Sequence, residues 1–119
     1  MAAYQAQNKK VSSCKCGPDY IDPMFHKEVL GVDSKNLDLF FSSEDELRKE
    51  YAKHAADAEL VITEGVMGYY DGLGGVSDRD STWDVACATN TPVILVVRPK
   101  GASLTIAAQV QGMLSFRKR

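Results

Sequence analysis

The 119-residue sequence lacks several features that would assign it to a broad class of protein. It has no apolar run long enough to cross a bilayer and no signal-peptide pattern, so we expect a cytoplasmic protein without a membrane partner. The formal net charge is only −2, which gives no reason to expect nucleic acid as a partner. With 45% hydrophobic and 25% charged residues, the composition is typical of one globular domain.

Cysteine is scarce and odd in number. Cys14, Cys16 and Cys87 cannot form a disulfide framework, and a bond between the near neighbours Cys14 and Cys16 would be strained. A zinc site is disfavoured as well, because structural sites need four closely spaced ligands and His26 is the nearest imidazole. We therefore expect the cysteines to be small apolar side chains in a reducing compartment.

Hydrophobic patterns and turn signals predict strands that alternate with helices. The expected strands cover residues 11–16, 59–63 and 92–97, and the expected helices cover residues 2–9, 42–57, 81–89 and 104–116. Segment 22–30 is interpreted as a loop with a helical turn, 31–34 as a break, and 72–80 as a mobile glycine-rich loop. Such alternation predicts an α/β fold, in which three or four parallel strands form a sheet with flanking helices.

Acidic residues occur where two of the predicted strands end. Asp19 and Asp22 follow the first strand in the run KCGPDYIDP, whose glycine and prolines constrain a turn. Glu64 directly follows the second strand in the run ELVITEGVMGYYDG. Parallel strands end at one edge of a sheet, which is where open α/β sheets bind ligands. We therefore expect the three acids on one rim, as ligands of a hard cation or as acid and base.

A purely structural alternative is open for each acid. Aspartate in a turn rich in Pro and Gly is often only a turn former. A single acid at the end of a strand is often simply solvated. Three acids that converge on one edge favour a functional site.

Four segments carry a family resemblance: GPDYIDPMFH, GVDSKNLDLFF, ELVITEGVMGYYDG and TPVILVVRPKGAS. In this order and spacing they closely resemble the synthetase domain of the cobyrinic acid a,c-diamide synthase family. The resemblance extends over residues 2–117, nearly the whole chain. Its motifs are long and specific, unlike a generic nucleotide-binding pattern.

The resemblance implies a P-loop NTPase-like fold, shared with dethiobiotin synthetase. Members of the family begin with a strand, a phosphate-binding P-loop and a helix, and end with a glutaminase domain. No G-x-x-x-x-G-K-[ST] motif occurs in this chain. We therefore interpret residues 1–119 as a partial synthetase domain without the first strand, the P-loop and the glutaminase domain. An incomplete sheet exposes an edge, which makes a homo-oligomer possible.

The same resemblance implies an ATP-dependent ligase of cobalamin biosynthesis. It would amidate the a- and c-side-chain carboxylates of cobyrinic acid through an acyl phosphate, with glutamine or ammonia as nitrogen donor. The implied ligands of Mg²⁺ are Asp19, Asp22 and Glu64, and Lys15 would steady the transferring phosphoryl group. Tyr20 and Asp71 would face the corrinoid substrate.

Two alternatives stay open at this point. One is a truncated, non-catalytic remnant that self-associates or binds a corrinoid, because this chain alone lacks a phosphate cradle and is expected to be inactive. The other is the equivalent amidation of hydrogenobyrinic acid or nickel-sirohydrochlorin. Nothing in the sequence distinguishes these tetrapyrroles.

Overall fold

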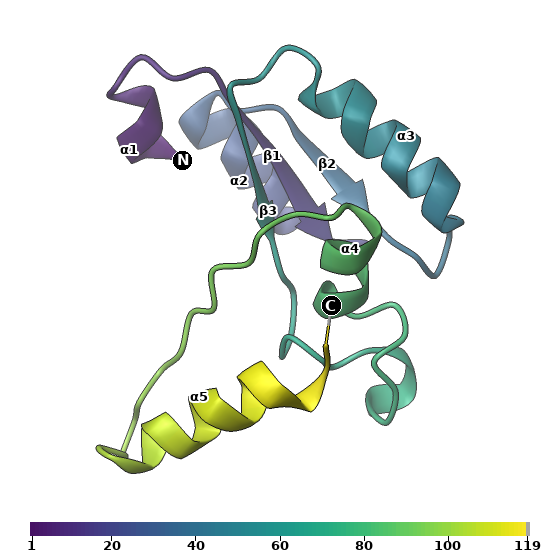
Figure 1. Ribbon diagram of the computed structural model, residues 1–119. Helices are drawn as coiled ribbons and strands as arrows, with labels where there is room; N and C mark the ends of the chain where they lie inside the picture. The colour runs from purple at the N-terminus through teal and green to yellow at the C-terminus, as the bar shows by residue number, and fades with distance from the viewer. Residues whose placement is uncertain (119) are drawn as a thin grey trace.

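Three parallel strands form a sheet in the N-terminal half of the chain. In the computed structural model, which describes residues 1–118, β1 (Val11–Cys16) lies between β2 (Ser34–Leu37) and β3 (Leu60–Glu64) (Figure 1). The register pairs Ser13 with Ser34 on one side and Lys15 with Glu64 on the other. The carboxyl ends of β1 and β3 therefore meet at one edge of the sheet.

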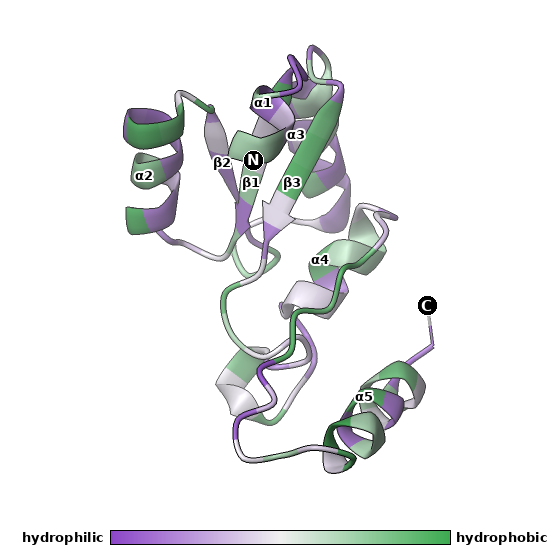
Figure 2. Cartoon of the chain, turned by 90° about the vertical axis from the view of Figure 1, so that its left-hand side faces the viewer, coloured by the Kyte–Doolittle hydropathy of each residue, from purple (hydrophilic) through white to green (hydrophobic). Residues whose placement is uncertain are grey.

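Two helices cover opposite faces of this sheet. α2 (Ile21–Leu30) connects β1 to β2, and α3 (Glu44–Ala55) connects β2 to β3 across β1. Crossovers between parallel strands are right-handed by rule. The chain first moves from β1 to β2 on one side and then back past β1 to β3 on the other. The two connecting helices therefore lie on opposite faces of the sheet. Figure 2 shows the sheet between α2 and α3.

The apolar core lies on the face of the sheet that α3 covers. Its buried members are Cys14, Cys16, Leu37, Leu47, Val85 and Ala88. α3 begins with a capping box, in which the Ser43 hydroxyl accepts from the Glu46 amide and the Glu46 carboxylate accepts from the Ser43 amide. α4 (Thr82–Ala88) completes the core and begins with the Ser81 hydroxyl accepting from the Asp84 amide.

The remaining elements are a short α1 (Ala2–Gln5), a 3-10 turn (Leu73–Gly75) and α5 (Thr105–Phe116). α5 lies apart from the sheet at the end of an irregular trace (Figure 1). No helix among the described residues is long and apolar enough to span a membrane.

The α/β class, the parallel sheet and the strands at 11–16 and 60–64 confirm the prediction, and so do the helices α3, α4 and α5. Two expectations about the N-terminal half were wrong. Segment 22–30 is a full helix, which ends at Gly31 in the left-handed conformation (φ 64°). The expected helix 2–9 is only four residues long and is followed by a turn in which Asn8 has φ 58°. The break expected at 31–34 covers only residues 31–33, because Ser34 begins the strand 34–37, which the sequence did not predict.

The expected strand 92–97 is also absent from the sheet. Within the part of the chain that the structure describes, the sheet ends at β3, and residues 92–97 form no ladder. Ile94 and Val96 are about 90% exposed, with values of 90% and 89%. A strand needs a neighbour for its backbone N–H and C=O groups, and high β-propensity alone does not supply one.

Candidate active site

The site begins with a register pair. β1 and β3 place Lys15 beside Glu64, so both side chains leave the same face of the sheet near the end of their strands. The Lys15 ammonium lies 3.7 Å from Glu64 Oε1. It also donates a hydrogen bond of 3.1 Å to the Gly65 carbonyl. The strand pairing therefore fixes a cation and an anion at the rim where ligands bind in open α/β sheets.

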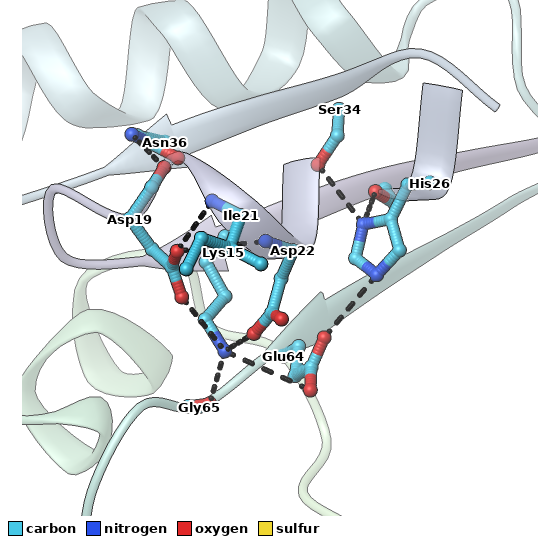
Figure 3. A network of polar contacts seen from close by, with 10 residues as sticks. Lys15, Asp19, Ile21, Asp22, His26, Ser34, Asn36, Glu64 and Gly65 are labelled. Carbon is cyan, nitrogen blue, oxygen red and sulfur yellow. Dashed lines mark hydrogen bonds and ion pairs between the residues drawn. The ribbon is translucent and has the colours of Figure 1, made fainter. Parts of the chain in front are cut away.

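The turn after β1 brings two further carboxylates to the same ammonium (Figure 3). Lys15 Nζ lies 2.5 Å from Asp22 Oδ2 and 3.6 Å from Asp19 Oδ2. Gly17 has φ 78°, a left-handed conformation that suits glycine, and it reverses the chain directly after the strand. Asp22 lies in the first turn of α2, close to the positive end of the helix dipole.

The contacts of Asp19 agree both with a turn former and with a member of the site. Its Oδ1 accepts from the Ile21 amide at 2.9 Å, which is the hydrogen bond of a turn-forming aspartate. Its Oδ2 faces Lys15. The Asn36 side chain of β2 donates to the Asp19 carbonyl at 2.8 Å and ties the turn to the sheet. The turn therefore holds Asp19 in place while one carboxylate oxygen remains directed at the cluster.

The electrostatics favour an ionised cluster. The Lys15 side chain is only 4% exposed. Burial works against its charge, but the hydrogen bond to Asp22 and the charges of Glu64, Asp22 and Asp19 raise the pKa of Lys15 above its usual value. The hydrogen bond from Lys15 in turn lowers the pKa of Asp22. One ammonium faces three carboxyl groups, a set that suits a further cation.

His26 of α2 is a further member of the polar network, and the sequence alone did not predict it. This side chain is buried, and its Nε2 lies 3.3 Å from Glu64 Oε2. Its Nδ1 lies 3.0 Å from Ser13 Oγ and 3.3 Å from Ser34 Oγ (Figure 3). The signal for it was the spacing of Asp22 and His26, which are four residues apart and share a face once segment 22–30 is a helix.

The donor chemistry of the site fits Mg²⁺, whereas its geometry differs from a preformed metal centre. Asp19, Asp22 and Glu64 offer the oxygen ligands that Mg²⁺ prefers. The ammonium of Lys15, however, lies at the point where they converge. Among residues 1–118, no three side chains of the metal-binding types are placed to hold an ion by themselves. A bound Mg²⁺ would need further ligands, such as waters or phosphate oxygens.

The two residues expected to face a substrate lie in different places. Tyr20 is 76% exposed and lines a hollow beside the acids, together with Met24 and Asn36. Asp71 lies in the loop after β3, where its carboxylate packs so closely against Gly68 that a Cβ there would come within 2.2 Å of Asp71 Oδ2. No described contact joins Asp71 to the Lys15 cluster. The structure therefore places Tyr20 near the site and leaves Asp71 outside the cluster.

Comparison with curated proteins identifies the relatives of the chain. It is 41% identical over its whole length to the cobyrinate a,c-diamide synthase of a Synechococcus species, and 43% identical over its whole length to that of Gloeobacter violaceus. In sequence, the chain belongs with the cobyrinate a,c-diamide synthases. It spans about a quarter (26%) of the length of these relatives.

A relative with the same name is found in a further organism. The synthase of Thermoplasma acidophilum is 43% identical over 93% of this chain. No family model matches the chain, and no solved structure matches it. The family resemblance is thus confirmed by sequence, while the expected likeness to P-loop NTPases remains a prediction.

Proposed function

We propose that this chain is part of the synthetase domain of an ATP-dependent ligase that converts cobyrinic acid to its a,c-diamide. The observation that carries the proposal is the register of β1 with β3. It brings Lys15 and Glu64 together at the edge of the sheet, where the turn after β1 adds Asp22, in a chain that matches cobyrinate a,c-diamide synthases along its whole length. The proposed partners are the corrinoid, ATP, and glutamine or ammonia.

The proposed reaction has two balanced steps. An oxygen of a corrinoid carboxylate attacks the γ-phosphorus of ATP, ADP leaves, and an acyl phosphate remains. Ammonia then attacks the acyl carbon, inorganic phosphate leaves, and the amide forms after loss of a proton. Phosphoryl transfer depends chiefly on positioning and on neutralisation of charge, which an ammonium and a cluster of metal-ligating carboxylates supply without a protein nucleophile.

Each member of the cluster has a defined task in this scheme. Asp19, Asp22 and Glu64 would hold Mg²⁺, which neutralises phosphate charge when it is bound. Lys15 would donate hydrogen bonds to an oxygen of the transferring group. Its ammonium has three donors and is held between β1 and β3, so it can keep a carboxylate partner while it donates to a phosphate. Tyr20, exposed beside the acids, would contact the corrinoid.

The phosphate cradle must come from another segment in this scheme. The chain contains no G-x-x-x-x-G-K-[ST] motif, so its own backbone amides do not form a P-loop. We propose that a longer polypeptide supplies this loop and the glutaminase activity, in agreement with the length of the relatives. The 119 residues alone should then neither bind Mg-ATP tightly nor amidate a corrinoid.

A graft tests the proposal. The matching quarter of the Synechococcus synthase is replaced by this chain, and the graft is assayed with cobyrinic acid, Mg-ATP and either glutamine or ammonia. We expect corrinoid-dependent release of ADP and a diamide product by mass spectrometry, with the unmodified synthase as control. A folded graft that binds Mg-ATP but forms no amide contradicts the proposal. The relative kcat/KM for hydrogenobyrinic acid and nickel-sirohydrochlorin then assigns the substrate.

Self-association without catalysis is the second candidate. The exposed side chains of Ile94 and Val96 favour it, because such apolar surface commonly marks an interaction site. Light scattering of the 119-residue chain tests this alternative, and a monomer at high concentration contradicts it.

A further inference from the structure

His26 is buried yet reaches the candidate active site from the side. Its side chain is 6% exposed, whereas that of Glu64 is 47% exposed. His26 therefore has little access to a ligand bound above the sheet edge, and Glu64 has ample access. Any effect of His26 on the reaction must pass through Glu64.

The partners of the imidazole determine which nitrogen carries the proton. His26 Nε2 lies 3.3 Å from Glu64 Oε2, within ion-pair distance, and an ionised carboxylate can only accept, so we infer that Nε2 carries a proton. In the neutral ring, Nδ1 is then the acceptor for the hydroxyls of Ser13 and Ser34. These serines are register partners on neighbouring strands, so the sheet itself holds the ring at Nδ1.

We propose that His26 is a positioning residue that holds Glu64 in the orientation required to bind the catalytic cation, an inference that rests on the function proposed above. The two oxygens of Glu64 have partners on different elements: Oε1 faces Lys15 of β1, and Oε2 faces His26 of α2. Lys15 alone, at 3.7 Å, leaves the carboxylate free to rotate. The second contact removes that freedom before the cation binds.

The other histidine provides a matched comparison. His54 of α3 is close to the opposite face of the same sheet, where its Nε2 lies 2.7 Å from Ser12 Oγ and 2.9 Å from the Ser13 carbonyl. Both histidines therefore contact a β1 serine, but only His26 also contacts a carboxylate of the cluster. A purely structural role predicts similar consequences when either ring is replaced.

Two substitutions of His26 separate the roles of its nitrogens. In the graft, His26→Gln keeps a donor near the position of Nε2, and His26→Asn keeps one near the position of Nδ1. We expect His26→Asn to raise the Mg²⁺ concentration for half-maximal rate about 10- to 100-fold, the typical cost of losing a residue that orients a metal ligand. His26→Gln should stay within a few-fold of wild type, and His54→Asn should leave the Mg²⁺ dependence unchanged.

Equal impairment of the Gln and Asn variants at native melting temperature overturns the proposal, and so does a wild-type Mg²⁺ dependence of both. If His26→Asn does not fold, the double variant Ser13→Ala and Ser34→Ala keeps the imidazole but removes the two hydroxyls that orient it. The proposal then requires a weaker response to Mg²⁺, and an unchanged response overturns it.

A second readout does not depend on activity. Nitrogen-15 spectra of the imidazoles in the wild-type graft should show His26 protonated at Nε2, and Glu64→Gln should shift that resonance but not those of His54. An unmoved Nε2 resonance overturns the contact and the proposal with it. A shifted resonance in a graft without ligase activity leaves the contact intact and shows instead that the proposed function has failed.

Discussion

The two faces of the sheet differ in chemistry although the same strands build both. The face under α3 presents Cys14, Cys16 and Leu37, which pack with Leu47 into an uncharged core. The face under α2 presents Ser13 and Lys15 of the same strand β1, and both contact ionisable side chains.

Residues that alternate along β1 therefore serve different purposes. Since successive side chains of a strand point to opposite faces, a six-residue strand can contribute to the core and to a polar site at once. Substitutions can therefore test the two faces separately. Changes on the α3 face should affect stability, and changes on the α2 face should affect the reaction.

The largest effect is expected on the α2 face. Glu64→Gln or Asp19→Asn, introduced into the graft, should lower turnover by about 10²–10³-fold, because each removes a carboxylate that would hold the Mg²⁺ that neutralises the transferring phosphate. Stability should change little, since Glu64 lies at an exposed strand end. Steady-state rates at saturating Mg-ATP measure the loss.

Glu59→Gln is the matched control for this prediction. Glu59 lies just before β3, pairs with Lys9 at the far end of the sheet, and is similarly exposed. Its replacement should leave turnover unchanged. Wild-type turnover of Glu64→Gln would remove the basis for a metal site at this edge.

The next effect is expected on the α3 face. Leu47 is 2% exposed and packs against β1 from the inner side of α3. Leu47→Ala should lower the free energy of unfolding by about 2–5 kcal/mol through loss of buried surface and formation of a cavity. Urea denaturation of the graft measures this change, provided that the grafted region gives a separate transition.

Lys49→Ala on the exposed side of α3 is the control, with an expected change within about 0.5 kcal/mol. The folded fraction of Leu47→Ala should turn over at the wild-type rate. A large fall in kcat with unchanged stability would contradict the separation of the two faces.

The sequence predicted the parts of the fold that have strong local signals. The apolar strand at 60–64 and the serine-capped helices α3 and α4 are of this kind. The sequence also predicted that Asp19, Asp22 and Glu64 meet at one edge, because that depends only on parallel pairing of two strands. Their roles as metal ligands stay a prediction.

The misses have particular physical causes. Pro23 suggested a loop, but it lies in the first turn of α2, where a backbone N–H has no helical partner to lose. β2 has the polar sequence SKNL and lies at the edge of the sheet, so it shows no apolar run. His26 became part of the site only through α2, and segment 92–97 has strand-like residues without a neighbouring strand.

The smallest effect is expected for the reactivity of the cysteines, whose main readout needs no substitution. Burial, the largest cause, raises the pKa of Cys14 to about 12 and that of Cys16 to about 11, and both thiols lie in the α3-face core. At pH 8 they should be almost entirely protonated and inaccessible to a thiol reagent, whereas Cys87 is only half-buried. We expect one thiol of the 119-residue chain to react at once and two to react only as the chain unfolds.

Leu47→Ala should speed this slow phase, because it loosens the core around Cys14, while Glu64→Gln on the other face should not. Labelling followed by peptide mass spectrometry assigns each thiol. Rapid labelling of Cys14 in the native chain would show that the core on the α3 face is open to solvent, and the two faces would then not differ as described.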